Sequence, residues 1–308
     1  MKLLVTGGLG FIGSNFILYA LKKYPDFKII NIDAELTGSN KKNIKKGKNY
    51  QFVKGNINNR QLMDRYVKKC DSVINFAAES HVDRSISGPK PFLDSNVIGL
   101  QVLLESIRKF NKKLIQISTD EVFGSLKKGS AKENDSFNPA SPYAASKAAA
   151  EMLANSYVKT YGCNIIITRC TNNYGPRQFE EKLIPKVILY AKQNKKIPVY
   201  GSGKNIRDWI YVDDHCEALL KVLSNGKEGE SYNISASNEL SNLRIIKTIL
   251  KIMKKSTNLI EFVPDRLGHD FRYSLDSNKT RQKLKWKPKV DFHTGLDNTI
   301  KWYLDRKW

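Results

Sequence analysis

Two carboxylic acids, Asp120 and Glu121, stand side by side directly after the apolar run KLIQI. Successive side chains of a strand point to opposite faces, so the chain must bend here if both acids face one ligand. In that case the two carboxyls must do different jobs. The alternative is a surface turn, because the segment that begins at Thr119 is also a typical helix-cap sequence.

A second pair, Tyr143 and Lys147, lies four residues apart in SPYAASKAAAEML. Ser141 and Pro142 predict a helix start, and the i, i+4 spacing places both side chains on one helix face. A neighbouring ammonium is expected to lower the tyrosine pKa from its usual value of about 10. The phenolate can then take a proton from an alcohol while a hydride leaves the carbon. Because this pattern is common, chance occurrence on a surface helix is the alternative.

A glycine-rich stretch, VTGGLGFIGS, supplies a partner for such chemistry. It contains Gly8-x-Gly10-x-x-Gly13, preceded by Gly7, between an apolar run and a helical pattern. This arrangement is typical of a dinucleotide site, in which a helix N-terminus holds the pyrophosphate. Asp33 follows at the end of the second apolar run, where it would bond a ribose 2′-hydroxyl and favour NAD over NADP. A purely structural glycine turn is the alternative.

Composition limits the class of protein. The chain has 308 residues, of which 41% are hydrophobic, enough for a large core. No run approaches the roughly 20 apolar residues of a membrane span, and the N-terminus lacks a signal-peptide layout, so a soluble cytoplasmic protein is expected. The scattered cysteines predict reduced structural thiols and neither a disulfide nor a metal site. They are Cys70, Cys163, Cys170 and Cys216.

The formal net charge of +22 raises the question of a nucleic-acid partner. The lysines are spread along the chain, and no RNA-binding signature accompanies them. We therefore interpret the charge as a solvated surface that can attract anionic small molecules, and we expect no nucleic acid and no membrane as partners. A nucleic-acid-binding or cofactor-sensing protein on a retained dehydrogenase scaffold is the rival hypothesis.

Short apolar runs alternate with helical patterns in the first half of the chain. This order predicts βαβ units and a Rossmann-type, doubly wound parallel sheet covered by helices on both faces. Strands are predicted at 2–7, 27–33, 50–55, 71–78, 112–119 and 163–169, and helices at 11–24, 59–69, 91–110 and 142–161.

The rhythm loosens after about residue 172, where prolines and glycines increase. We assign residues 1–172 to an NAD-binding domain, with a returning segment near 207–235. Residues 173–308 are expected to form mainly a smaller, substrate-binding lobe. Within the returning segment, 207–223 is expected to be a strand and then a helix that rejoin the sheet, and 183–193 is expected to be a core-facing helix.

Seven segments in a fixed order carry a family resemblance: TGGLGFIGSNF, NFAAESHVDRSI, ISTDEVFG, SPYAASKAAAE, RCTNNYGPRQFEEKLIP, PVYGSGKNIRDWIYVDDH and GHDFRY. On these segments nearly the whole chain resembles the extended short-chain dehydrogenase/reductases. Within them it is most similar to the nucleotide-diphosphate-glucose 4,6-dehydratases, of which dTDP-glucose 4,6-dehydratase is the type. TDEV followed by YxxxK is the most specific mark.

The resemblance implies a lyase reaction with bound NAD. The sugar is oxidised at C4, water is lost across C5–C6, and the hydride returns to C6. Tyr143 is implied as the base at the 4-OH, which Thr119 also contacts, with Lys147 beside it. Asp120 is implied as the acid at the 6-OH and Glu121 as the base at C5. Two such carboxyls must differ in protonation, and burial and like charge push their pKa values apart.

The resemblance also implies binding positions for the cofactor and the substrate. No metal site is expected, because neither His81 nor His269 has a second ligand at metal spacing. For Arg207, the alternative to substrate binding is a structural salt bridge to Asp208 or Asp213. Cofactor positions are Gly7, Gly10, Phe11, Ile12, Gly13, Asp33, Asn56, Ile57, Ala77, Ala78, Ser80, Tyr143, Lys147 and Asn173. Substrate positions are Ser80, Thr119, Asn172, Lys182, Leu183, Pro198, Tyr200, Arg207, Asn242, Arg266, His269 and Asp270.

This sequence departs from the family pattern at Asn56, where relatives carry an aspartate that meets the adenine amino group, and in the segment after Asp33. An amide oxygen can still accept that bond. Alternatives within the family are a UDP-glucose 4,6-dehydratase, a nucleotide-sugar epimerase and a UDP-glucuronate decarboxylase. Relatives dimerise through the helices that correspond to 91–110 and 142–161, so a homodimer is expected.

Overall fold

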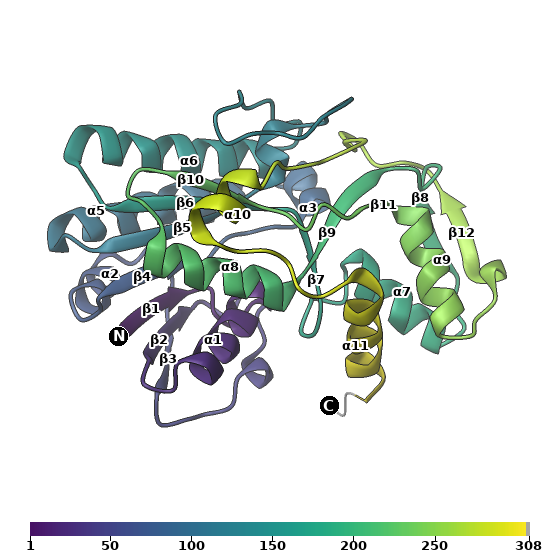
Figure 1. Ribbon diagram of the computed structural model, residues 1–308, viewed down its shortest axis with the longest axis horizontal. Coiled ribbons are helices and arrows are strands. Elements are labelled where there is room, and N and C mark those ends of the chain that lie inside the picture. Colours follow the sequence, from purple (N-terminus) through teal and green to yellow (C-terminus); the bar gives the residue numbers. More distant parts are fainter. Residues whose placement is uncertain (306–308) are drawn as a thin grey trace.

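The computed structural model describes residues 1–305, and within that range the largest sheet has seven strands, all parallel. Their order is β10-β6-β5-β4-β1-β2-β3 (Figure 1), the doubly wound arrangement that the sequence predicts. The strands are β1 (Lys2–Thr6), β2 (Lys28–Asp33), β3 (Tyr50–Lys54), β4 (Ser72–Asn75), β5 (Lys113–Thr119), β6 (Ile165–Cys170) and β10 (Ser231–Ile234).

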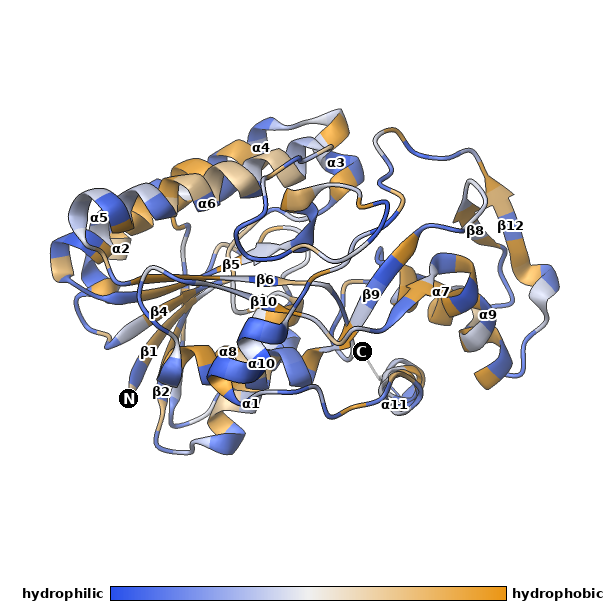
Figure 2. Ribbon diagram, turned by 45° about the horizontal axis from the view of Figure 1, so that its top comes forward, coloured by the Kyte–Doolittle hydropathy of each residue, from blue (hydrophilic) through white to orange (hydrophobic). Residues whose placement is uncertain are grey.

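Helices cover both faces of this sheet because its strands are apolar on both sides. Leu3 and Val5 of β1 pack into one core, and Leu4 between them packs into the other, as the two-residue period of a strand requires. Figure 2 shows the strands as an apolar layer between the two helical layers. On the first side lie α1 (Phe11–Lys23), α8 (Val212–Asn225) and α10 (Asn278–Leu284), and on the second α2 (Arg60–Val67), α5 (Leu100–Phe110) and α6 (Pro142–Tyr161).

A smaller lobe with its own core lies at the carboxyl edge of the main sheet (Figure 1). Among the described residues it holds a three-stranded sheet, β11-β9-β7, and a two-stranded sheet, β12-β8. Its helix α7 (Leu183–Lys192) buries Ile184, Val187 and Ile188, which confirms the predicted core-facing helix. The other elements are β7 (Asn172–Tyr174), β8 (Ile197–Tyr200), β9 (Ile206–Tyr211), β11 (Glu239–Ser241), α9 (Asn242–Ile252), β12 (Ile260–Val263) and α11 (Phe292–Asp305).

The returning segment differs from its prediction at the start. The run 207–211 lies in β9, which pairs with β7 and β11 in the small sheet and not with the main sheet. Only α8 and β10 rejoin the main sheet, where α8 packs on α1 and β10 pairs with β6. Local pattern cannot tell which sheet an apolar strand will join, because partner choice depends on contacts distant in the chain.

The predicted helix over 91–110 is interrupted. The chain forms α4 (Lys90–Leu93), a π-helical turn at Asp94–Gly99, and then α5. The wider turn presents Asn96 inward, where its side chain bonds the backbone N–H and C=O of Glu79 and the hydroxyl of Ser146. π-Helical turns are frequent at functional sites, and this one fixes the segment that follows β4 against α6.

The bend that the two adjacent acids require is present. β5 ends at Thr119, and Asp120–Phe123 forms a 3₁₀ turn in which the Glu121 N–H donates to the Thr119 hydroxyl. Gly124 ends the turn at φ 68° and ψ −166°, a conformation that is almost confined to glycine. A Cβ at Gly124 would lie 2.1 Å from the carbonyl oxygen of Asn138, whose N–H bonds Val122.

No helix among residues 1–305 is both long enough and apolar enough to cross a membrane.

We expect Gly124→Ala to destabilise the fold by roughly 3 kcal/mol, because it adds a steric overlap to the cost of a strained φ. Urea unfolding followed by circular dichroism measures the change. Gly129→Ala is the matched control, since Gly129 also has a positive φ, 71°, but has nothing within 4 Å of the added Cβ. Equal losses in both variants would show that the contact with Asn138 is unimportant.

Candidate active site

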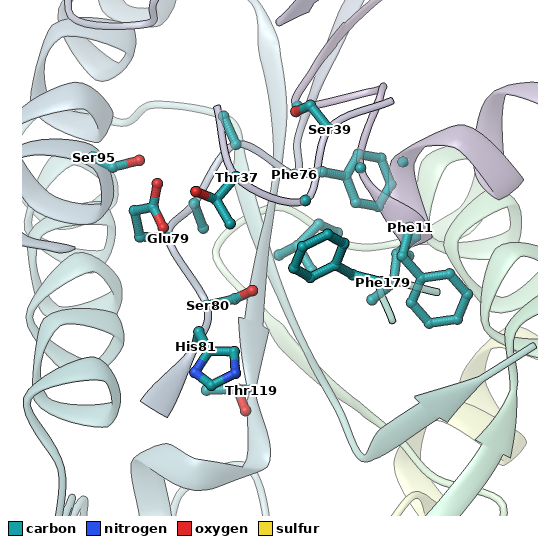
Figure 3. Close-up of a pocket in the computed structure, with 18 of the residues that line it drawn as sticks. Phe11, Thr37, Ser39, Phe76, Glu79, Ser80, His81, Ser95, Thr119 and Phe179 are labelled. Carbon is teal, nitrogen blue, oxygen red and sulfur yellow. The ribbon is translucent and has the colours of Figure 1, made fainter. Parts of the chain in front are cut away.

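A cavity of about 330 Å³ opens at the carboxyl ends of the main-sheet strands, where open α/β sheets place their ligands. Every cofactor position and every catalytic residue predicted from the sequence lines it. Figure 3 shows Thr37, Glu79 and Ser95 facing one another at one end, with His81 and Thr119 toward the other. The structure therefore brings together residues that come from both halves of the chain.

The glycine-rich loop between β1 and α1 has no room for a side chain at Gly7 or Gly8. Gly7 has φ +69°, and a Cβ there would lie 2.5 Å from the backbone nitrogen of Ala77. Helix α1 begins at Phe11 after the N-cap Gly10, which has no side chain to cap the N–H groups of the first turn. Backbone N–H groups at such a helix start suit a pyrophosphate, so the loop fits the dinucleotide that the sequence indicates.

Asp33 ends β2 and is buried in this cavity. Its Oδ2 accepts from the Leu9 N–H at 2.9 Å, and its Oδ1 accepts from the Glu35 N–H and the Ser39 hydroxyl, both at 2.8 Å. Asp33 therefore shapes the loop that follows it. A carboxylate accepts about four hydrogen bonds, so one acceptor position is left for a ribose hydroxyl.

Several lining residues were not identified from the sequence, because their types carry no specific signal. Leu36, Thr37 and Ser39 come from the loop whose sequence departs from the family pattern, and Ser95 comes from the π-helical turn. Further residues line the first cavity, and several of them lie within the seven segments that carry the family resemblance. They are Phe76, Glu79, His81, Cys170, Gln178, Phe179 and Glu181.

Thr119 and Asp120 are tightly packed at the bend. The Thr119 hydroxyl donates to Asp120 Oδ1 at 3.1 Å, and Oδ2 of Asp120 is buried without a partner among the described residues. Burial, and then the neighbouring Glu121 carboxylate, raise the pKa of Asp120 from 3.8 to about 8. Asp120 is therefore a protonated acid at neutral pH, with one oxygen free to meet a ligand.

Burial also raises the pKa of Glu121, but cations oppose this shift. Arg207, Lys182 and Arg266 lower the Glu121 pKa, although Asp270 raises it, whereas Arg207 is the cation that lowers the Asp120 pKa. The surroundings thus favour the ionised form at Glu121 more than at Asp120, which is the unequal protonation that an acid and a base require.

Tyr143 and Lys147 lie one helical turn apart on α6, and both are buried. The Lys147 ammonium donates to the backbone oxygen of Ile117 at 2.6 Å, and burial lowers its pKa to about 8. The expected lowering of the tyrosine pKa is wrong for this structure. Burial, followed by the Glu121 carboxylate, raises the Tyr143 pKa well above 10, because losing water costs a phenolate more than nearby dipoles return.

A second cavity, of about 180 Å³, lies next to the first, between the small lobe and the main-sheet domain. Four cations line it, Lys182, Lys186, Arg207 and Arg266, an arrangement that suits a diphosphate. Of the predicted substrate positions, Ser80 and Thr119 line the first cavity, Asn172 and Lys182 line both, and the remaining eight line the second: Leu183, Pro198, Tyr200, Arg207, Asn242, Arg266, His269 and Asp270.

Arg207 does not form the alternative salt bridge with Asp208 or Asp213 within residues 1–305. Its guanidinium donates to the backbone oxygens of Ile206, Phe271 and Asp270 at 2.8, 3.2 and 2.9 Å, and stacks 4.3 Å from the Tyr273 ring centroid. These contacts orient the guanidinium without neutralising its charge, so the charge stays available to an anionic ligand.

The two cavities meet at the 3₁₀ turn Asp120–Phe123, which carries Asp120 and Glu121 and is called the acid turn below. Six residues line both of them: His81, Glu121, Asn172, Gln178, Glu181 and Lys182. His81 Nε2 lies 3.3 Å from Glu181 Oε2, and burial lowers the His81 pKa. In the part of the chain that the structure describes, no group of three histidine, cysteine or acidic side chains could hold a metal ion, and all four cysteines are free and buried.

The fold and site define an extended short-chain dehydrogenase/reductase, in which a Rossmann-type sheet carries the dinucleotide loop and the YxxxK helix, and a smaller lobe faces them. The chain belongs to the GDP-mannose 4,6 dehydratase family, which it matches over residues 4–299. Both statements agree with the resemblance that the sequence segments indicate.

Three relatives show how close the similarity is. The low-salt glycan biosynthesis protein Agl12 of Haloferax volcanii is 46% identical over 308 residues, which span 99% of each chain. The crystal structure of DesIV, a dTDP-glucose 4,6-dehydratase from Streptomyces venezuelae with NAD and dTDP bound, superposes with a TM-score of 0.97 at 41% identity, covering 99% of this chain and 97% of that one. A Bacillus anthracis dTDP-glucose 4,6-dehydratase in complex with NAD gives 0.94 at 45% identity, with 100% and 97% covered.

The raised pKa of Asp120 has a consequence for stability. The unfolded chain, in which the carboxyl has a pKa of 3.8, releases this proton near pH 4. The folded carboxyl keeps the proton up to about pH 8. Folding stability from this group is therefore fully present below pH 4 and declines as pH rises to 8. We expect Asp120→Asn, which carries no charge to bury, to be more stable than the original chain by roughly 2–4 kcal/mol at pH 7.

Urea unfolding at pH 7 and at pH 4 measures this difference, which should shrink at the lower pH. Asp297→Asn, at an exposed position on α11, is the control and should change neither value. The opposite result is a stability difference, variant minus original chain, that is smaller at pH 7 than at pH 4. That result would show that Asp120 is ionised when folded.

Proposed function

We propose that this protein is an NAD-dependent nucleotide-sugar 4,6-dehydratase that converts dTDP-glucose into dTDP-4-keto-6-deoxyglucose and water. One observation carries the proposal: the Tyr143–Lys147 pair and the Asp120–Glu121 pair converge where a dinucleotide cavity meets a cation-lined cavity. The two solved relatives named above as dTDP-glucose 4,6-dehydratases support it.

The glycine loop, Asp33 and Lys147 would hold the NAD. NAD supplies an acceptor for the hydride of C4 and later a donor to C6. Tyr143 takes the proton of the 4-OH. The Tyr143 pKa is high in this structure, but the Thr119 hydroxyl lowers it, and the positive charge of an oxidised nicotinamide would favour the phenolate further.

Elimination of water is assigned to the two acids. The ketone at C4 acidifies the C5 proton, which Glu121 removes because nearby cations favour its ionised form. Asp120 gives its proton to the departing 6-OH, which matches a pKa of about 8 and an unpartnered buried oxygen. The C5 proton and the 6-OH are close together on the sugar. Two neighbouring carboxyls can therefore reach both of them.

The nucleotide would occupy the second cavity. Lys182, Arg207 and Arg266 would face the diphosphate, and the pyrimidine would lie among residues of β8 and α9. In this proposal, residues 1–172 with the returning segment near 207–235 serve mainly NAD, and residues 173–308 serve mainly the substrate. The lining of the two cavities supports that division.

The test is incubation of the purified protein with dTDP-, UDP- and CDP-glucose. We expect the alkaline absorbance of a 4-keto product and the mass loss of one water, fastest with dTDP-glucose. Faster turnover of UDP-glucose would favour a UDP-glucose 4,6-dehydratase. A C4 epimer without mass loss would favour an epimerase, and carbon dioxide from UDP-glucuronate would favour a decarboxylase.

Amide variants separate the two halves of the reaction. Asp120→Asn and Glu121→Gln should keep C4 oxidation but lower water loss by about 10²–10⁴-fold, the range of general acid–base catalysis. Product formation that survives both changes would contradict the roles given to the two acids.

We also propose a homodimer that uses α6 and the segment around α4. Large apolar side chains are exposed there, including Met152 at 65%, Ile98 at 52% and Leu93 at 49%. Apolar groups so exposed on neighbouring helices favour burial against a second copy. Sedimentation velocity should show a dimer that Met152→Glu weakens, and a monomeric original chain would contradict the proposal.

The cytoplasm is the location we propose, supported by four free, buried cysteines of the kind found in reducing compartments. Recovery of the protein outside the cytoplasmic fraction of its cell would contradict this.

A further inference from the structure

A buried ion pair lies directly behind the acid turn. Arg169 of β6 and Glu151 of α6 are 2% and 0% exposed. The Arg169 Nε lies 3.0 Å from both Glu151 carboxylate oxygens, and its Nη2 lies 2.6 Å from Oε2. Its Nη1 donates to the backbone oxygen of Glu133 at 3.0 Å. Each nitrogen of the guanidinium therefore has a partner, which a buried charge requires.

The same guanidinium packs on two aromatic rings. Its central carbon lies 5.0 Å from the Phe123 ring centroid and 5.3 Å from that of Phe137, and the two rings contact each other edge to face. Phe123 is the last residue of the 3₁₀ turn that begins at Asp120. Arg169 itself pairs in register with Ser118 of β5, one residue before Thr119. It therefore contacts the acid turn at its end and flanks the strand that leads into it.

Glu151 connects this arrangement to the other half of the site. Tyr143, Lys147 and Glu151 are spaced by four residues on α6 and share one face. The Glu151 carboxylate acts on Lys147 and raises its pKa against the effect of burial. Ala148, on the same helix, packs with Val122 and Phe123 in a small apolar cluster beneath the turn. The ion pair thus links α6, which carries Tyr143 and Lys147, to Arg169 of β6, which packs on the last residue of the turn that carries Asp120 and Glu121.

Stability alone is a poor explanation for this pair. Buried ion pairs often stabilise a fold no more than apolar residues of the same volume, because both charges lose water. A guanidinium that is held at three nitrogens and stacked on an aromatic ring does, however, fix both the orientation of its partners and their distance from one another. Acid and base catalysis depends on such placement, since a shift of about 1 Å can cost about 10²-fold in rate.

We propose that the Arg169–Glu151 pair, with Phe123 and Phe137, is a positioning device that sets the Asp120–Glu121 turn relative to the Tyr143–Lys147 helix. This inference rests on the proposed function. It concerns the second half of the reaction, since loss of the device moves the acids relative to the sugar while Tyr143 and Lys147 remain on their own helix. Water loss should therefore suffer more than oxidation at C4.

The experiment compares Arg169→Met, Glu151→Gln, the double variant and Phe137→Leu with the original chain. Rapid mixing of the NAD-loaded proteins with dTDP-glucose follows the absorbance of reduced nicotinamide, and the alkaline absorbance of the product follows water loss. All rates are expressed per folded, cofactor-loaded site. Val67→Ala, a buried α2 substitution outside the device, is the control for general loss of stability.

We expect water loss to fall about 10–100-fold in Arg169→Met while C4 oxidation changes less than about threefold, so that reduced cofactor accumulates during turnover. Phe137→Leu, which keeps the ion pair, should shift the ratio of the two rates in the same direction. The double variant should lose less than the product of the two single losses, because Arg169 and Glu151 act as one unit.

Val67→Ala should leave the ratio unchanged. An unchanged ratio in Arg169→Met and Phe137→Leu, or an equal fall of both rates, would overturn the positioning role while leaving the proposed function intact. Failure of the original chain to release water from any of the three nucleotide-glucoses would instead overturn the proposed function, and the positioning role with it. Fully additive losses in the double variant would contradict action as a unit.

Discussion

Removal of ionisable side chains from water is the physical constraint on which this site depends. Asp120, Tyr143 and Lys147 are buried where main-sheet strands end, and burial is the largest cause of the pKa shift of each. Such groups can be kept buried only by a surrounding fold that is stable without them. The main sheet provides that stability, with an apolar core on each of its faces.

The two lobes divide the chemical work by charge. The dinucleotide cavity combines glycine backbone and small side chains with five acids, whereas the second cavity carries four cations from the smaller lobe. Glu121 lies where they join, so the same arginine and lysine that suit a diphosphate also favour the ionised form of the proposed base. Placing substrate binding next to the acid turn thus tunes the acid–base pair through electrostatics alone.

Irregular backbone occurs where the site needs it. The 3₁₀ turn after β5 turns two adjacent acids toward one region, and the π-helical turn before α5 directs Asn96 onto the segment after β4. The Arg169–Glu151 pair joins β6 to α6 beside the acid turn, and neither residue lines the two cavities. Regular elements supply the rigidity, and these few departures aim the side chains.

The order of short apolar runs and helical patterns was sufficient to predict the parallel sheet, since a strand buried on both faces is apolar throughout. Residue types at short spacing were likewise sufficient to find the glycine loop, Asp33, the acid pair and Tyr143–Lys147, because their chemistry is local. Only the tertiary structure decided where β9 pairs, that Arg207 bonds backbone oxygens and, within residues 1–305, no carboxylate, and that the Tyr143 pKa rises. Strand pairing, the Arg207 contacts and the Tyr143 pKa all depend on residues distant in the chain and on how much water those residues exclude. A local pattern of residues contains neither the distant contacts nor the extent of burial.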